Sequence, residues 1–302
     1  MAELSEQANR RDPSPPIDFS RGIVMGHEFV GEVREHGPDT KGLRPGTPVV
    51  AMPALVTDLT IGSNGLPTFR SIGYSSDISG GYAEQMLLST MLTLEVPNGL
   101  APRHAALTEP LAVGAHAVAK ALLVPGDTAV VHGCGPVGLA VIAALRLVGV
   151  ESIVAGDFSP RRRDLAQQLG ATLVVDPANE PTIDAWYRID GRSSLVQFEC
   201  IGVPGILDMA MREAPRLSRI VVVGACMEPD RVHPLFGISK ELNVQFVLAY
   251  TADEFAATLR NLAEGRLDAA PLISSSIPLE AIAGAFTALA APDQEVKILV
   301  EP

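Results

Sequence analysis

The chain has 302 residues, of which 47% are hydrophobic, and it carries a formal net charge of -12 at pH 7. This length predicts one large domain or two ordinary ones. The negative charge repels nucleic acid phosphates and anionic lipid surfaces, so we expect no nucleic acid and no membrane as partner. No apolar run reaches the roughly eighteen residues that a membrane-spanning helix needs.

Cysteine usage and the start of the sequence indicate the compartment. The three cysteines, Cys134, Cys200 and Cys226, are scattered and form no CxxC pair. This pattern argues against a disulfide framework and against a cysteine-rich zinc lobe. The first residues are polar and proline-rich, without the apolar core of a signal peptide. We therefore expect a cytoplasmic protein with reduced thiols.

The first third of the chain is typical of a β-rich domain. Residues 1–20 are predicted to be a loose lead-in, and short β-prone runs follow, separated by turn signals such as Arg44-Pro45-Gly46. The predicted strands are 28–33, 48–52, 82–88 and 91–96, and their shortness favours a barrel-like domain. The segment 54–79 is rich in Gly, Ser, Thr and Asp and is predicted to be a long loop.

Beyond Pro102, predicted strands alternate with predicted helices. The expected helices are 105–121, 137–148, 161–169, 253–263 and 279–290. The expected strands are 128–132, 152–155, 173–175, 195–199, 220–224, 244–248 and 297–300. Such alternation builds a parallel sheet covered by helices on both faces, so the predicted fold class is α/β with a doubly wound sheet.

One segment joins an apolar strand, a glycine turn and a helix start: Val130-Val131-His132-Gly133-Cys134-Gly135-Pro136-Val137-Gly138. In the GxGxxG spacing, the first glycine allows a tight turn, the second lets a pyrophosphate approach, and the third lets the helix pack closely. Pro136 and Val137 open the helix, whose positive N-terminus has unpaired N–H groups for phosphate. The spacing alone is weak evidence, and an ordinary βαβ turn is the alternative. The surrounding strand and helix favour a dinucleotide site.

An aspartate follows the next predicted strand. Asp157 lies 19 positions after Gly138, close to the distance expected for an acid that binds the adenosine ribose. A carboxylate at this place accepts both ribose hydroxyls and repels a 2′-phosphate, which favours NAD over NADP. The neighbouring cluster Arg161-Arg162-Arg163 leaves NADP as an alternative, since arginines bind that phosphate. The cluster is otherwise a solvated helix face.

A second pattern indicates a metal site. His27 and Glu28 are adjacent, flanked by Gly26 and Gly31, and imidazole and carboxylate are both zinc ligands. A lone His-Glu pair is more often an ordinary surface or core feature. Glu109, ahead of an apolar helix, supplies a third ligand, and three protein ligands with one open position suffice for a catalytic zinc.

Several segments in order now resemble a family. They are GHEFVGEV (26–33), GGYAE (80–84), TEPLAVGAHAV (108–118), the HGCGPVG turn and the closing KILVEP (297–302). Together they resemble the medium-chain, zinc-dependent alcohol dehydrogenases, and Glu109 places the resemblance nearest the polyol and threonine dehydrogenase branch. The resemblance runs from about residue 22 to the end.

The resemblance implies two domains. A GroES-like catalytic domain would comprise 21–115 and 251–302, and a Rossmann NAD-binding domain would comprise 116–250, with zinc and nicotinamide between them. It also implies a homodimer or homotetramer, formed through the edge of the nucleotide-domain sheet.

The resemblance also implies roles for individual residues. His27 would be a zinc ligand, Glu28 a ligand or a group beside one, and Glu109 the remaining protein ligand, so that these three form the catalytic centre. Gly133, Gly135, Gly138 and Asp157 would bind NAD. Arg162 would lie near the adenosine, and 222–224, with Gly224, near the nicotinamide.

The sequence departs from the family pattern at its first zinc ligand. The family has a cysteine in a Cys-Gly-x-Asp segment upstream of GHE, whereas no cysteine precedes Cys134 here. Met1 is expected to fall inside the family pattern, so the catalytic domain would be N-terminally incomplete. The cysteines of the family's structural zinc lobe are also absent from 54–79. One imidazole and two carboxylates still hold a divalent ion, with weaker zinc affinity than a thiolate site.

The leading functional hypothesis is an NAD-dependent enzyme that takes a hydride from a small alcohol or polyol, with zinc as Lewis acid. A zinc-free NAD(P)H-dependent reductase of the quinone oxidoreductase type is one alternative. A non-catalytic nucleotide-binding remnant is the other.

Overall fold

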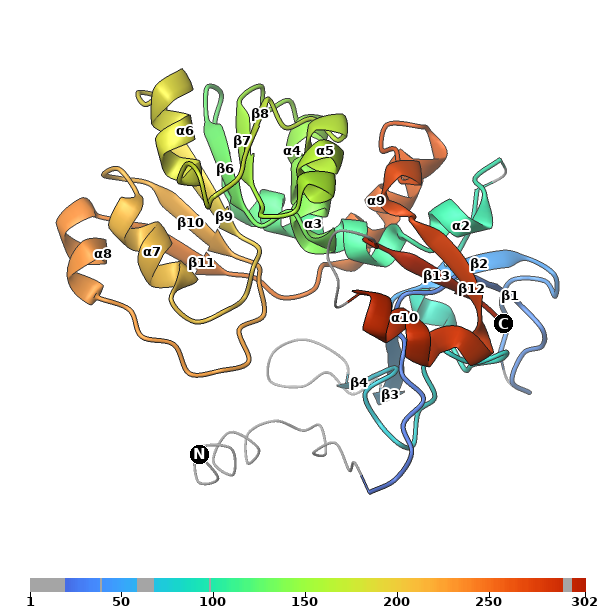
Figure 1. The fold of residues 1–302 in the computed structure, drawn as a ribbon. Coiled ribbons are helices and arrows are strands. Elements are labelled where there is room, and N and C mark those ends of the chain that lie inside the picture. Colours follow the sequence, from blue (N-terminus) through green and yellow to red (C-terminus); the bar gives the residue numbers. More distant parts are fainter. Residues whose placement is uncertain (1–19, 39, 59–67, 98, 290–294) are drawn as a thin grey trace. The chain divides into compact units, whose positions relative to one another are not determined.

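The structure, a computed structural model, describes residues 20–38, 40–58, 68–97, 99–289 and 295–302. The predicted lead-in lies outside these residues except for Ser20, as does the middle of the predicted loop 54–79. The chain divides into two compact units (Figure 1). The smaller unit comprises Met1–Val96 with Val300–Pro302, and the larger unit comprises Pro97–Leu299.

The smaller unit is built on short antiparallel strands. Strand β2 (Pro48–Ala51) pairs with β1 (Gly31–Glu32) on one side and with β5 (Thr93–Glu95) on the other. The 3-10 helix η1 (Thr90–Leu92) directly precedes β5 in the chain. Strands β3 (Ala54–Asp58) and β4 (Thr68–Ser71) pair separately. Val49 and Val50 are buried, which anchors the three-stranded sheet.

Two local predictions for the smaller unit were wrong. Residues 82–88 form no strand, because the backbone of residues 80–82 bonds instead to residues 24–26. The predicted loop 54–79 contains β3 and β4 at its two ends. Its polar composition concealed a hairpin whose strand residues alternate poorly.

The larger unit contains a six-stranded parallel sheet in the order β11-β10-β9-β6-β7-β8 (Figure 1). The strands are β6 (Thr128–His132), β7 (Ile153–Gly156), β8 (Leu173–Val175), β9 (Leu195–Glu199), β10 (Arg219–Val222) and β11 (Asn243–Phe246). Starting from β8, this is the 3-2-1-4-5-6 order of the Rossmann fold. The predicted doubly wound sheet is confirmed.

Helices cover both faces of this sheet, and the strand residues alternate between them. On one face, Ala129 and Val131 pack in the core cluster that contains α4 (Pro136–Leu147) and α5 (Pro160–Gln168). On the other face, Val130 packs with Trp186 of α6 (Thr182–Ile189). Helices α7 (Ile206–Glu213) and α8 (Pro234–Lys240) cover β10 on that second face. Burial on both sides explains the continuous apolar runs of these strands.

The predicted helix 105–121 is two helices, α2 (Pro102–Ala105) and α3 (Thr108–Lys120). Helix α9 (Ala252–Ala263) starts with a capping box made by Thr251 and Glu254, and it packs against α3. The chain continues through η2 (Ala270–Leu272), β12 (Ser275–Pro278), η3 (Leu279–Ala281) and α10 (Ile282–Leu289) to β13 (Ile298–Glu301), which pairs with β12. Among the described residues, no helix is both long and apolar enough to cross a membrane.

Candidate active site

The His-Glu pair lies in the smaller unit, in the loop that leads into β1. Backbone bonds fix this loop: Gly80 N donates to Val24 O at 2.7 Å, Gly81 N to Gly26 O at 2.7 Å, and Tyr82 N to Met25 O at 3.0 Å. Both side chains are partly exposed, and one ligand atom of each lies within 4.8 Å of the other. The segment therefore presents an imidazole and a carboxylate close together.

A tyrosine lies near Glu28 in the same unit. Burial, reinforced by the negative charge of Glu28, raises the pKa of Tyr82 above its ordinary value of 10.0. This phenol therefore keeps its proton at neutral pH.

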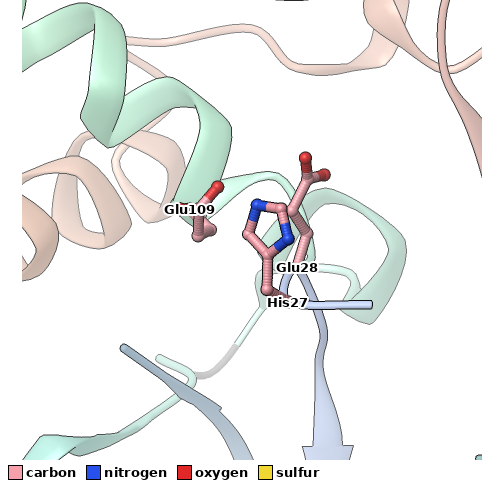
Figure 2. Close-up of side chains that lie close together, drawn as sticks. All are labelled: His27, Glu28 and Glu109. Atoms are coloured by element: carbon pink, nitrogen blue, oxygen red, sulfur yellow. The ribbon is translucent and has the colours of Figure 1, made fainter. Parts of the chain in front are cut away.

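Glu109 lies in the larger unit, in the first turn of α3 (Figure 2). Its side chain is buried, and the hydroxyl of Tyr250 donates a hydrogen bond to Oε1 at 3.1 Å. The ring of Tyr250 stacks on Phe255 with 5.4 Å between centroids. The positive end of the α3 dipole favours an ionised carboxylate at this position. Sequence reasoning missed Tyr250, because no local pattern links it to Glu109, which lies 141 positions away in the chain.

The three residues are chemically suited to a zinc ion. They offer one imidazole nitrogen and two carboxylates, a set that zinc accepts in catalytic sites. His27 and Glu28 belong to one unit and Glu109 to the other, so combining them in one centre is part of the function proposed below.

The glycine turn between β6 and α4 has the geometry that a dinucleotide requires. Gly133 has φ +89°, and a Cβ added to Gly138 would lie 1.9 Å from the carbonyl oxygen of Gly133. The backbone conformation at Gly133 and the close packing at Gly138 thus both require glycine, whether or not a cofactor is bound. Gly135 differs, because its φ of -67° suits any residue and an added Cβ would meet no atom within 4 Å. The open space beside Gly135 is where a pyrophosphate would approach.

Helix α4 begins at this open space. Gly135 is the N-cap and offers no side-chain cap, and Pro136 has no N–H, so the first N–H groups of the helix are those of Val137 and Gly138, which no capping side chain accepts. Unpaired N–H groups and the helix dipole together favour an anion there. The turn fits the diphosphate of a nicotinamide cofactor.

Asp157 ties the end of β7 to the glycine turn. Its Oδ2 accepts from Cys134 N at 2.8 Å and its Oδ1 accepts from Ser159 N at 2.9 Å. A carboxylate has about four acceptor positions, so roughly two remain for ribose hydroxyls. Sequence reasoning predicted the ribose role but not this structural one.

The arginine cluster divides into different environments. Arg163 is held by the backbone that follows β7, because its Nη1 donates to Asp157 O at 2.7 Å and to Phe158 O at 2.8 Å. The same Nη1 forms an ion pair with Asp176 at 3.4 Å. Arg162 Nη1 lies 4.0 Å from Asp157 Oδ2, and Arg162 Nε is buried without a hydrogen-bond partner. Of the three arginines, Arg162 is thus the one whose guanidinium lies near the carboxylate of Asp157.

The thiols around the turn are chemically inert. Burial, with a smaller contribution from the charge of Asp157, raises the pKa of Cys134 far above its ordinary value. Burial does the same for Cys200. Since the thiolate is the reactive form, neither group is suited to nucleophilic or ligand chemistry.

Glu199, at the end of β9, organises the neighbouring turns and was missed by sequence reasoning. Its buried Oε1 accepts from Ile201 N at 2.7 Å and Gly202 N at 2.8 Å, and its carbonyl accepts from Val223 N and Gly224 N. A Cβ on Gly224 would lie 2.4 Å from Gly202 N. The two turns after β9 and β10 are therefore locked together. The sequence pattern that could have indicated this role is an acidic residue at the end of an apolar strand, three positions before Gly202.

Comparison with known proteins gives the family. The model of the "Alcohol dehydrogenase GroES-like domain" matches residues 4–98, and that of "Zinc-binding dehydrogenase" matches residues 136–264. (R,R)-butanediol dehydrogenase of Bacillus subtilis is 34% identical over 292 residues, which are 96% of this chain and 84% of that protein.

Solved structures agree with these matches. The crystal structure of 2R,3R-butanediol dehydrogenase from Bacillus subtilis has a TM-score of 0.83 at 33% identity, covering 95% of this chain and 84% of that one. A zinc-binding dehydrogenase from Sinorhizobium meliloti 1021, crystallised with NADP, has a TM-score of 0.83 at 27% identity, covering 95% and 85%.

The chain belongs to the zinc-dependent medium-chain alcohol dehydrogenase family. It is accordingly an oxidoreductase of the alcohol dehydrogenase class, and its cofactors are zinc and a nicotinamide dinucleotide.

Proposed function

We propose that this protein oxidises a secondary alcohol of a small diol or polyol with NAD, and catalyses the reverse reduction of the ketone. The observation that carries the proposal is the 34% identity to a butanediol dehydrogenase over 96% of the chain. No observation favours the zinc-free quinone reductase alternative.

In this proposal His27, Glu28 and Glu109 are the metal ligands. The adjacency of His27 and Glu28 and the hydrogen bond from Tyr250 that orients Glu109 support the assignment. At this site a bound zinc would supply a Lewis acid for the alcohol oxygen, and the nicotinamide cofactor would supply the hydride acceptor. The residues would supply binding and orientation, since the hydroxyl of Tyr250 fixes one carboxylate oxygen of Glu109.

The cofactor would be held by Gly133, Gly135, Pro136, Val137, Gly138, Asp157, Arg162 and Gly224. The space at Gly135 supports diphosphate binding, and the carboxylate of Asp157 supports NAD over NADP. Arg162, with a buried Nε that lacks a hydrogen-bond partner, is the group that would admit NADP. Glu199 would keep Gly224 and its turn in place.

We further propose the domain assignment 21–115 with 251–302 for the GroES-like catalytic domain and 116–250 for the Rossmann domain. The compact units have different bounds, since they divide the chain after Val96 and again after Leu299. Packing and domain ancestry need not divide a chain at the same residues.

A homodimer or homotetramer in the cytoplasm completes the proposal. Strand β11 ends the parallel sheet, and large apolar side chains on and beside it are exposed, namely Phe246, Leu248, Leu235 and Ile238. Exposed apolar groups beside a sheet edge favour association. Three free cysteines, one of them exposed, fit a reducing compartment. Light scattering of wild type and Phe246→Asp tests the assembly, which we expect the variant to weaken.

The functional test is NADH formation by the full chain over a panel of diols and polyols, with added zinc, with a chelator, and with NADP in place of NAD. We expect turnover of at least one diol or polyol, its loss on chelation, and a preference for NAD. Chelator-resistant turnover would favour the zinc-free reductase. NADH binding without turnover of any substrate would favour the non-catalytic remnant.

A further inference from the structure

A tyrosine in the smaller unit contacts the predicted metal ligand His27. The hydroxyl of Tyr74 lies 3.1 Å from Nδ1 of His27. The centroids of the two rings are 5.3 Å apart, with 34° between the planes. Tyr74 falls in a segment predicted only to be loop, and the predicted site does not include it.

Backbone geometry fixes this pair from both sides. Gly73, directly before Tyr74, has φ +80°, and a Cβ there would lie 2.6 Å from the carbonyl oxygen of Gly26, directly before His27. The two segments of the chain thus touch at Gly73 and Gly26, each of which directly precedes one of the aromatic residues. No other residue type fits at Gly73 without a backbone shift, so both rings extend from main chain that is held in close contact.

The segment that carries Tyr74 is also anchored on both sides. Ile72 is fully buried, and its N–H donates to Pro53 O at 2.9 Å. On the other side, Arg70 donates to Ser75 Oγ at 3.2 Å, and Asp77 pairs with Arg21 at 2.9 Å. Although Tyr74 itself is half-exposed, its main chain is held like a core element.

The chemical consequence concerns the tautomer of His27. A neutral imidazole carries one N–H, and only the other nitrogen has a lone pair for a metal ion. Metal-binding histidines usually donate the remaining N–H to an oxygen, which fixes ring orientation and raises the basicity of the ligand. The Tyr74 oxygen is positioned to accept that bond from Nδ1.

We propose that Tyr74 is a positioning residue that accepts the Nδ1–H of His27 and so presents Nε2 to the metal ion. The inference rests on the proposed function, since it takes His27 as a ligand. Tyr74 touches neither metal nor substrate in this scheme. It acts only through the ring of His27.

The test uses the full chain with Tyr74→Phe, which removes the hydroxyl and keeps the ring. Zinc affinity is measured by competition with a chromogenic chelator. We expect the apparent Kd for zinc to rise roughly tenfold to a hundredfold, the usual effect of losing such a partner. Tyr187→Phe is the matched control, because it makes the same change at a half-exposed tyrosine of the larger unit. It should leave the Kd unchanged.

A second measurement does not involve metal. Nitrogen–proton NMR of histidine-labelled, zinc-free protein reports which nitrogen of His27 carries the proton. We expect Nδ1–H in the wild type and a mixture of tautomers in Tyr74→Phe. An Nε2–H proton in the wild type, or equal zinc affinity in the two proteins, would overturn the inference. If His27→Ala binds zinc as tightly as the wild type, the proposed metal site fails, whatever the tautomer result.

Discussion

The two regions that carry the proposed chemistry are built differently. The cofactor region in the larger unit is made of backbone: glycines that a Cβ would not fit, strand ends, and two carboxylates, Asp157 and Glu199, that accept backbone N–H groups. The metal region offers side chains, the partly exposed His27 and Glu28 on a loop and the buried Glu109 on a helix. In the proposed function, dinucleotide binding would thus depend on the shape of the main chain, whereas metal binding would depend on three functional groups.

This difference has a consequence for mutation. A change at His27 or Glu28 removes one donor and leaves the fold intact, because partly exposed loop side chains contribute little packing. A change in the glycine turn alters the main chain and affects folding and cofactor affinity together. The predictions below separate these two responses.

The largest effect is expected for His27→Ala. Losing a zinc ligand removes several kcal/mol of charge stabilisation in the transition state, so kcat/KM should fall roughly a thousandfold or more. The Kd for NADH, measured by fluorescence, should change less than about twofold, since the glycine turn is untouched. The comparison between the two regions breaks down if NADH affinity falls in parallel with turnover.

Gly138→Ala should damage the larger unit itself. The added Cβ would lie 1.9 Å from the Gly133 carbonyl oxygen, so the turn must shift. We expect a loss of about 1–3 kcal/mol in unfolding free energy, typical of overpacking, together with weakened NADH binding. Denaturant unfolding and NADH titration check both. A variant with wild-type stability would show that the turn is more adaptable than its geometry indicates.

The sequence predicted the strands of the sheet that carries the cofactor region more closely than those of the smaller unit, for a physical reason. Strands β6 and β9 have the predicted bounds, because burial on both faces leaves a continuous apolar signal. The GxGxxG spacing and Asp157 are short-range patterns within one βαβ unit. The spacing, read together with the strand and helix around it, predicts their role in a dinucleotide site.

What the sequence could not supply are contacts between distant segments. Tyr74 meets His27 across 47 positions, and Tyr250 meets Glu109 across 141. No periodicity links such residues, since their proximity follows from the packing of whole elements. Helices α6, α7 and α8 were missed for a more local reason, because they are short and follow turn-rich segments.

Gly135→Ala sharpens the comparison within the glycine turn. The φ of -67° suits alanine and an added Cβ meets no protein atom within 4 Å, so the unfolding free energy should stay within about 1 kcal/mol. The methyl group would instead occupy the space expected for the pyrophosphate. We expect NADH binding to weaken about tenfold, which is about 1.4 kcal/mol. Unchanged affinity would mean that the diphosphate does not approach there.

The smallest effect concerns the pH dependence of the larger unit. Burial alone would raise the pKa of the Glu254 carboxyl, but hydrogen bonds from Thr251 and from His116, at 2.8 Å, outweigh it and hold that pKa below its ordinary value of 4.5. In the window below 4.5 the unfolded chain therefore binds more protons than the folded one. The stability from Glu254, fully present above that value, is lost as pH falls through the lower folded pKa.

Glu254→Gln should therefore lower the unfolding free energy at neutral pH by about 1–2 kcal/mol, through weakened charge-assisted bonds, and flatten its decline in acid. Glu213 provides a control of opposite sign, because burial raises the pKa of its carboxyl. Ionised Glu213 opposes folding at neutral pH, so Glu213→Gln should leave stability equal or slightly higher there. Thermal unfolding from neutral pH down to about pH 3.5 distinguishes the two variants. If stability declines with falling pH equally in Glu254→Gln and in the wild type, the contact of Glu254 with His116 does not stabilise the fold as inferred.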